Sequence, residues 1–318
     1  MSTADMLRAR LRLPVISSPM FLVSTPELVI QQCLGGIVGS FPALNARPQA
    51  ELAVWLGRID AVLSEARAAG NPHVAPHAVN LVIRKDAPRL SEDLATCVAF
   101  KVPLVITSLG APTEIVQQVH GYGGLVFHDV TTVRHARSAL RAGVDGLILV
   151  CAGAGGHGGG LSPFALLREV RAFYDGPIVL AGAMTTGADI LAAQVMGADL
   201  VYMGTRFIAT HEAGASEEYK QMIVDSTAAD IVYTPYFSGT PANYLGPSIT
   251  QAGLDLDELK RSGARAEPGE RHLRWKSVWG AGQGVGSISD SPGAGLLIDR
   301  LADEYAVARS DWRGRLDT

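Results

Sequence analysis

The stretch GLILVCAGAGGHGGGLSP, residues 146–163, contains the pattern from which the fold can be predicted. It begins with an unbroken apolar run, which is typical of a β-strand covered on both faces in a parallel sheet. A glycine-rich loop follows, and Ser162-Pro163 is a common start of a helix. The stretch therefore predicts one strand–loop–helix unit of an α/β protein.

Units of the same kind recur along the chain. Between the apolar runs lie segments with helical spacing, for example Leu52, Leu56 and Ile59. With right-handed crossovers, about eight such units over residues 13–224 predict a (β/α)8 TIM barrel. A doubly wound sheet is the alternative, but it should open with a GxGxxG motif that residues 13–40 lack. The other apolar runs are LPVI (13–16), GIV (36–38), VNLVI (79–83), PLVIT (103–107), GLVF (124–127), PIVLA (177–181) and LVYM (200–203).

Residues 225–290 do not follow this alternation of strands and helices. This predicts that they form an excursion from the barrel, near its mouth. The stretch YTPYFSGTPANYLGPS (233–248) has no barrel pattern, and residues 260–274 are polar and rich in arginine. A helix around Leu297 then follows. We expect a single TIM-barrel domain over residues 1–318, with this insertion and a C-terminal closing helix.

Composition and charge exclude several classes of function. Hydrophobic residues make up 47% and charged residues 18% of the chain, and no apolar run approaches the roughly 20 residues of a membrane span. The 27 basic and 31 acidic residues leave a net charge of −4, so no nucleic acid partner is expected. Cys33, Cys97 and Cys151 lack CxxC spacing, and the histidines at 120–135 lack a carboxylate at metal-ligand spacing. We predict no disulfide, no metal site and a cytoplasmic location.

Two strand ends late in the barrel sequence are candidates for a phosphate site. The run PIVLA ends in Gly182-Ala183, and the run LVYM ends in Gly204-Thr205. Backbone N–H groups at such turns can hold a phosphate, because glycine has no side chain to block its approach. TIM barrels often bind phosphate after strands seven and eight. A tight turn without a ligand is the alternative for each glycine taken alone.

The loop CAGAGGHGGG (151–160) has the highest density of glycines in the sequence, with six in ten residues. Its glycines, Gly155 and Gly156 among them, let a flat ligand contact the backbone, and His157 is the titratable group between them. A solvated histidine on a flexible loop is the alternative. Because the end of a barrel strand is where an acid or base is useful, we predict that His157 is catalytic.

Two further motifs have structural interpretations. The stretch HDV at 128–130 predicts a strand end with Asp129 as a helix N-cap. The stretch GQGVG at 282–286 is not preceded by a convincing strand, so it predicts a glycine-rich loop lining the pocket rather than a dinucleotide motif.

The opening LPVISSPMF (13–21) and the strand AVNLV (78–82) look like one family of enzymes, and five motifs within residues 152–288 match the same family in their order, so the likeness spans nearly the whole chain. These five are AGAGGHGG (152–159), LAGAMTTG (180–187), ADLVYMGTRFIAT (198–210), YFSGTPANYL (236–245) and WGAGQGVGSI (279–288). Together they resemble the nitronate monooxygenases, formerly called 2-nitropropane dioxygenases, which are FMN-dependent TIM barrels.

The resemblance implies roles for individual residues. It implies that Met20 and Asn80 contact the flavin ring, that Ser108 lies near it, and that His157 is the catalytic histidine. The FMN phosphate would be held by Gly182, Ala183, Gly204 and Thr205.

The sequence departs from the family pattern at two positions. Gly153 stands where a glutamate is often found, which removes a carboxylate from the glycine-rich loop. Asp129 stands where some relatives have a lysine, which removes a cation.

The resemblance also implies a reaction, the oxidation of alkyl nitronates and nitroalkanes with O2. The neutral imidazole of His157 could stabilise the nitronate anion or remove the α-proton of a nitroalkane. The same scaffold occurs in FMN-dependent NAD(P)H:quinone and enoyl reductases, so a reductase that uses NAD(P)H is the alternative. A catalytically silent flavin-binding barrel is a third hypothesis, against which His157 argues. No pattern indicates an oligomeric state.

Overall fold

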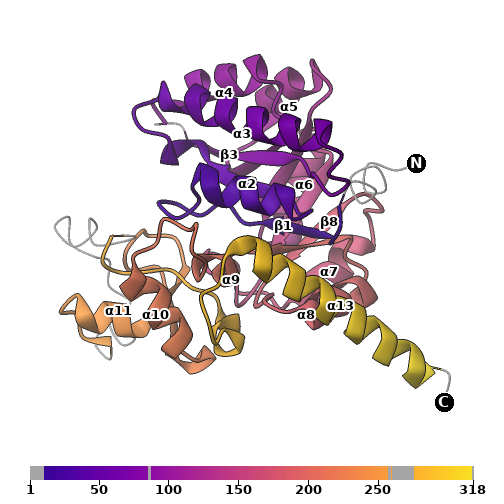
Figure 1. Ribbon diagram of the computed structural model, residues 1–318. Helices are drawn as coiled ribbons and strands as arrows, with labels where there is room; N and C mark the ends of the chain where they lie inside the picture. The colour runs from indigo at the N-terminus through magenta and orange to yellow at the C-terminus, as the bar shows by residue number, and fades with distance from the viewer. Residues whose placement is uncertain (1–10, 85–86, 257–258, 260–275, 317–318) are drawn as a thin grey trace.

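A closed barrel of parallel strands forms the centre of the computed structural model (Figure 1). The strand order is β1-β9-β8-β6-β5-β4-β3-β2, and a parallel bridge between Ile16 and Val38 joins the first strand to the last. The predicted (β/α)8 barrel is confirmed. The strands are β1 (Val15–Ser17), β2 (Gly39–Pro42), β3 (His77–Ile83), β4 (Leu104–Leu109), β5 (Leu125–Val130), β6 (Gly146–Val150), β8 (Ile178–Ala181) and β9 (Leu200–Met203). The residues that the structure describes are 11–84, 87–256, 259 and 276–316.

Helices between the strands cover the outside of the barrel. They are α2 (Pro26–Leu34), α3 (Glu51–Ala68), α4 (Leu90–Ala99), α5 (Thr113–His120), α6 (Val133–Arg141), α7 (Pro163–Arg171) and α8 (Gly187–Met196). Their ends follow local signals. Helix α2 begins at Pro26, and Thr25 Oγ1 accepts a hydrogen bond from Leu28 N–H at 3.1 Å. Helix α8 ends at Gly197, whose φ of +108° is favourable for glycine alone.

The strands separate two apolar layers. Alternate residues such as Ile106, Phe127 and Ile148 fill the barrel interior. Their neighbours, such as Val105 and Val126, pack against the helices outside. Successive residues of a strand point to opposite faces, so the continuous apolar runs of the sequence supply both layers. Each buried side chain of this size contributes about 1.5–3 kcal/mol to stability.

The chain leaves the barrel pattern after β9. The elements of this region are α9 (Thr205–Ile208), α10 (Glu217–Asp225), η2 (Ala228–Asp230), β10 (Ile231–Thr234), β11 (Ala242–Leu245), α11 (Gly246–Gln251) and η4 (Gln283–Ser287). Strands β10 and β11 form an antiparallel sheet with β7 (Gly156–His157), which lies in the glycine-rich loop. The segment after β9 is therefore bound to the loop that follows β6. Residues 257–258 and 260–275, with most of the arginine-rich stretch, lie outside the described residues.

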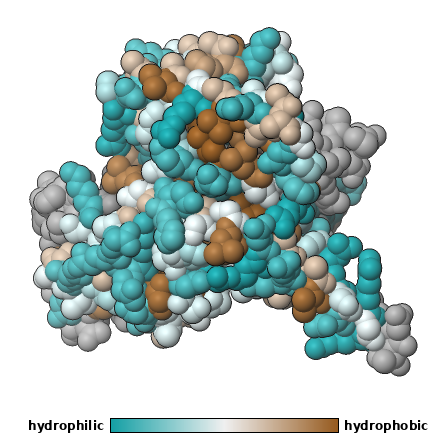
Figure 2. All heavy atoms as spheres, in the orientation of Figure 1, coloured by the Kyte–Doolittle hydropathy of each residue, from teal (hydrophilic) through white to brown (hydrophobic). Residues whose placement is uncertain are grey.

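The predicted closing helix is α13 (Ala294–Leu316). Leu297 and Leu301 are buried where this helix packs against α8 and α2. Its C-terminal part extends away from the barrel (Figure 1). The face drawn in Figure 2 is mostly hydrophilic, with a group of apolar residues over α2 and α3. Among the described residues, no helix is long and apolar enough to cross a membrane.

Candidate active site

A cavity of about 1100 Å³ lies at the carboxyl ends of the barrel strands, where TIM barrels bind their ligands. This volume suits a large small-molecule ligand. The residues predicted to be catalytic or to bind the cofactor come from different strands and loops, yet they all line this cavity. They are Met20, Asn80, Ser108, Gly155, Gly156, His157, Gly182, Ala183, Gly204 and Thr205.

The absence of a side chain matters at both strand-end glycines, Gly182 and Gly204. Gly182 has a φ of +132°, and a Cβ atom there would lie 2.6 Å from the carbonyl oxygen of Ala152. A Cβ atom on Gly204 would lie 3.3 Å from Ser18 Cβ and 3.7 Å from Met20 Sδ, both in the cavity wall. Gly182 therefore lets two backbone segments approach closely, and Gly204 keeps its part of the cavity wall free of a side chain.

The loop at 282–286 packs directly on the glycine-rich loop and lines the cavity, as predicted. Gly282 N–H donates a hydrogen bond to Thr205 Oγ1 at 2.8 Å. A Cβ atom on Gly282 would lie 2.5 Å from the carbonyl oxygen of Gly153, and one on Gly155 would lie 2.8 Å from Gly282 N. Glycine is thus required on both sides of this contact, because two backbones approach each other here.

His157 lies in β7, at the border of the cavity, and is held by the segment after β9. Its Nε2 atom is 2.9 Å from Ser238 Oγ. Ser238 Oγ donates its single proton to the carbonyl oxygen of Thr240 at 2.8 Å. The hydroxyl therefore accepts from His157 Nε2–H, and the lone pair of a neutral imidazole is on Nδ1. Ser238 lies in the motif YFSGTPANYL (236–245), but nothing in that motif marked it as the partner of His157.

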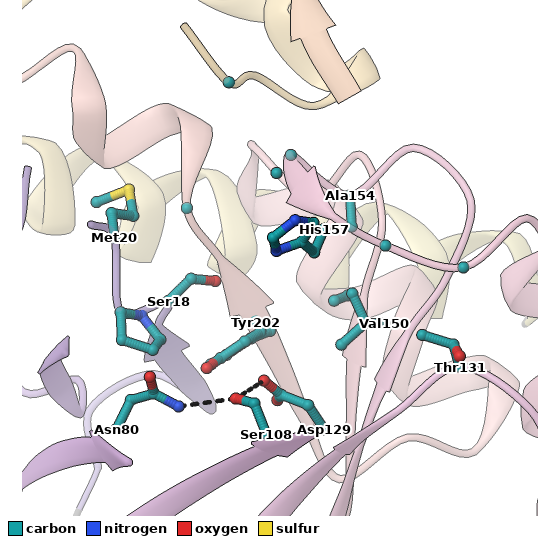
Figure 3. Close-up of a pocket in the computed structure, with 18 of the residues that line it drawn as sticks. Ser18, Met20, Asn80, Ser108, Asp129, Thr131, Val150, Ala154, His157 and Tyr202 are labelled. Carbon is teal, nitrogen blue, oxygen red and sulfur yellow. Dashed lines mark hydrogen bonds between the residues drawn. The ribbon is translucent and has the colours of Figure 1, made fainter. Parts of the chain in front are cut away.

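Polar side chains from four strands meet on the floor of the cavity (Figure 3). Asn80 Nδ2 donates to Ser108 Oγ at 2.9 Å, and Ser108 Oγ donates to Asp129 Oδ2 at 2.9 Å. Tyr202 of β9 lies beside this chain of hydrogen bonds. The resemblance pointed to Asn80 and Ser108, whereas the contributions of Asp129 and Tyr202 were not predicted.

The prediction that Asp129 caps a helix is wrong. Asp129 lies within β5, and the N-cap of α6 is Thr132, whose Oγ1 accepts from His135 N–H at 3.2 Å. Phe127 points into the barrel, so Asp129, two residues further along the strand, points the same way. The period-two alternation of a strand is the signal that could have placed this carboxyl group in the cavity.

Burial shifts the pKa values of Asp129 and Tyr202 on the cavity floor, and that of His128 on β5. It raises the pKa of Asp129 from 3.8 to about 7, although the hydrogen bond from Ser108 opposes the change. It also raises the pKa of the Tyr202 phenol well above 10. His128 has its pKa lowered to about 4, by burial and then by the nearby His135. Near neutral pH the tyrosine and His128 are therefore uncharged, and Asp129 is partly protonated.

The cysteines have no redox partner. Cys33, Cys97 and Cys151 are buried and unpaired, and burial raises the pKa of each thiol to about 12. They remain protonated near neutral pH and behave as small apolar side chains. Within the described part of the chain, no cluster of three histidine, cysteine or carboxylate side chains could hold a metal ion.

Comparison with known proteins links this site to one family. Residues 58–270 match the model of the nitronate monooxygenase family. A probable nitronate monooxygenase of Staphylococcus haemolyticus is 26% identical over 262 residues, which cover 74% of this chain and 73% of that protein. A nitronate monooxygenase of Paraburkholderia phytofirmans is 28% identical over 283 residues, which cover 76% of each chain.

Two solved structures resemble the whole fold. A nitroalkane oxidase from Streptomyces ansochromogenes matches with a TM-score of 0.81 and 25% identity, over 95% of this chain and 98% of that one. FabK from Thermotoga maritima matches with a TM-score of 0.79 and 25% identity, over 98% of each chain. The likeness therefore includes the segment after β9 as well as the barrel.

Proposed function

Since the chain belongs to the nitronate monooxygenase family and is a flavin-dependent oxidoreductase, we propose that it binds FMN and oxidises alkyl nitronates with O2. The observation that carries this proposal is the placement of His157 in the same cavity as the strand-end glycines Gly182 and Gly204. One cavity thus has room for a phosphate, a planar ring and a small organic anion, with an imidazole at its border.

The residues present suit FMN. The phosphate would bind at the cavity wall formed by Gly182 and Gly204, where Gly204 has no side chain to block it and Thr205 follows directly in sequence. Met20 would contact the ring from the wall, and Asn80 and Ser108 would contact it from the floor. FAD would need additional space for its adenosine, and the mononucleotide matches the single phosphate site that we propose.

The protein would position the substrate, stabilise its negative charge and accept its proton. Bound FMN would supply the electron acceptor and the route to O2. His157 would donate a hydrogen bond to the anionic substrate when protonated and would accept the α-proton of a neutral nitroalkane when neutral.

Anaerobic mixing tests the proposal. The flavin of the purified protein is first identified by mass after extraction, with FMN expected. The loaded protein is then mixed with ethylnitronate without O2, and we expect the flavin absorbance to bleach and to return when O2 is admitted.

The same apparatus distinguishes the alternatives. Bleaching by NADPH or NADH but not by nitronate would support the reductase instead. Bleaching by neither would support a silent flavin-binding barrel. A colourless protein that fails to bind added FMN would contradict every one of these functions.

A further inference from the structure

Two buried oxygen atoms on the cavity floor have no hydrogen-bond partner among the described residues. Asp129 Oδ1 and Tyr202 Oη are both shielded from solvent, and neither forms a hydrogen bond with any residue that the structure describes. Buried polar atoms in folded proteins are nearly always paired. Since both atoms lie at the edge of a cavity, they point to a ligand that completes their hydrogen bonds.

The existing hydrogen bonds determine what each atom can offer to a ligand. Ser108 Oγ uses its proton on Asp129 Oδ2, so Oδ1 is the oxygen of this carboxyl group that is left for a ligand. Tyr202 keeps its proton, because burial raises its pKa well above 10. If Asp129 is neutral, the floor presents two O–H donors; if it is ionised, it presents one donor and one negative charge.

The surroundings favour the neutral acid. Within the described residues no lysine or arginine forms an ion pair with Asp129, and burial raises its pKa to about 7. The adjoining strands present Ser108 of β4 and the apolar Ile148 of β6. On β5 itself, His128 is uncharged and contacts Thr107 Oγ1 at 2.8 Å.

Other titratable groups border the same cavity from elements further along the chain. Helix α6 contributes His135, whose Nδ1 is 3.1 Å from Thr131 Oγ1, and β7 contributes His157. The cations of the cavity wall come from other loops and are Arg47, Arg84 and Lys276. A test must therefore separate Asp129 from these histidines.

We propose that Asp129 in its neutral form is a flavin-binding residue, which together with Tyr202 donates hydrogen bonds to acceptor atoms of the flavin ring. The pyrimidine edge of the ring carries the acceptors N1, O2, O4 and N5, whose lone pairs a carboxylate would repel, and a single N–H donor at N3. Flavin binding therefore takes up a proton wherever the free protein holds Asp129 ionised. The inference rests on the proposed function only in taking flavin as the ligand.

Riboflavin binding to the full-length protein stripped of flavin tests this inference. Riboflavin is the probe because it has the ring of FMN without a phosphate that titrates near pH 6. Fluorescence quenching gives its Kd between about pH 6 and pH 9. We expect Kd to rise about 10- to 100-fold over this range, because only the protonated form of Asp129 binds well.

Variants identify the titrating group. Asp129→Asn has an amide donor at every pH, so its Kd should stay near the low-pH value of the wild type across the range. Asp129→Ala lacks the donor and should bind weakly at every pH. The controls His135→Asn and His157→Asn should keep the wild-type rise in Kd.

Several outcomes would overturn the inference. They are a wild-type Kd that is constant or falls with pH, and a rise that persists in Asp129→Asn. The wild-type profile is decisive even if a variant does not fold. Flavin binding with a flat profile leaves the proposed function intact, whereas no flavin binding at any pH overturns the function and the inference together.

Discussion

His157 is the residue on which the proposed chemistry depends, and it can be replaced without removing its donor. In His157→Asn the amide can still donate toward Ser238, but it cannot accept a proton near neutral pH. We expect turnover of nitroethane to fall about 100-fold or more, because proton abstraction is lost, and turnover of ethylnitronate to fall less. The kcat/KM values for the two substrates measure this difference.

The flavin content of His157→Asn serves as its control. Because the phosphate is proposed to bind near Gly182 and Gly204, the variant should purify with the same amount of flavin as the wild type. Equal losses on both substrates would show that His157 does not act as a base. Unchanged activity on both would show that it is only a loop residue.

Strand β11 is the element that holds the glycine-rich loop (151–160) in place. It is anchored by Tyr244, which is fully buried with Phe237 in an apolar cluster outside the barrel. From the same strand, the buried Asn243 donates through Nδ2 to the carbonyl oxygen of Ala154 at 2.7 Å. The pairing of Ala242 with His157 then sets the register of the loop. The position of the imidazole therefore depends on a strand far away in the sequence.

Removing the Asn243 side chain should loosen this loop. In Asn243→Ala the carbonyl of Ala154 loses its partner, so the free energy of unfolding should fall by about 1 kcal/mol. Displacement of His157 should lower kcat about 10-fold or more. Denaturant unfolding, steady-state kinetics and amide exchange of residues 152–160 measure these effects.

Thr250→Ala provides the matched control for Asn243→Ala. It removes a side chain from α11 whose Oγ1, among the residues that the structure describes, bonds within that helix, to Gly246 O at 3.4 Å. It should leave loop exchange and kcat unchanged. If Asn243→Ala exchanged its loop amides no faster than Thr250→Ala does, β11 would not be the element that orders the loop.

The stability of the whole molecule should depend on pH through His77, a buried histidine that does not line the cavity. Burial lowers the pKa of His77, at the start of β3, from 6.5 to about 4. Its 3.6 Å approach to Asp60 is therefore a contact of a neutral ring rather than an ion pair. Between about pH 4 and 6.5 the unfolded chain binds more protons at this site, so stability falls as the pH falls through this window.

In the variant His77→Gln, the free energy of unfolding should fall less steeply as the pH decreases from about 6.5 to 4. The shift corresponds to about 2–3 kcal/mol of stability present at pH 7 and lost near pH 4. His128 acts in the same direction and Asp129 in the opposite one, so the comparison uses the slope of stability against pH rather than its absolute value. Urea unfolding between pH 4.5 and 7 measures it. Identical slopes in variant and wild type would assign the acid sensitivity to other groups.

Much of the fold could be predicted because its signals are local. Unbroken apolar runs such as GLILV and PIVLA predict strands covered on both faces, and they need no knowledge of distant residues. The strand ends at Gly182, Gly204 and His157 could also be located, since a parallel barrel places all its carboxyl ends on one side. The resemblance then supplied Met20, Asn80 and Ser108, which line the same cavity.

The sequence by itself thus determined the barrel, its cavity side and the residues at its strand ends. Only the tertiary structure decided that Ser238 and Asn243 bind the glycine-rich loop, and that Asp129 faces the cavity beside Tyr202 instead of capping α6. The physical reason is that strand periodicity and turn geometry arise from neighbouring residues. Hydrogen bonds across the fold and the pKa of a buried carboxyl group depend on register and burial, which exist only once distant segments have packed together.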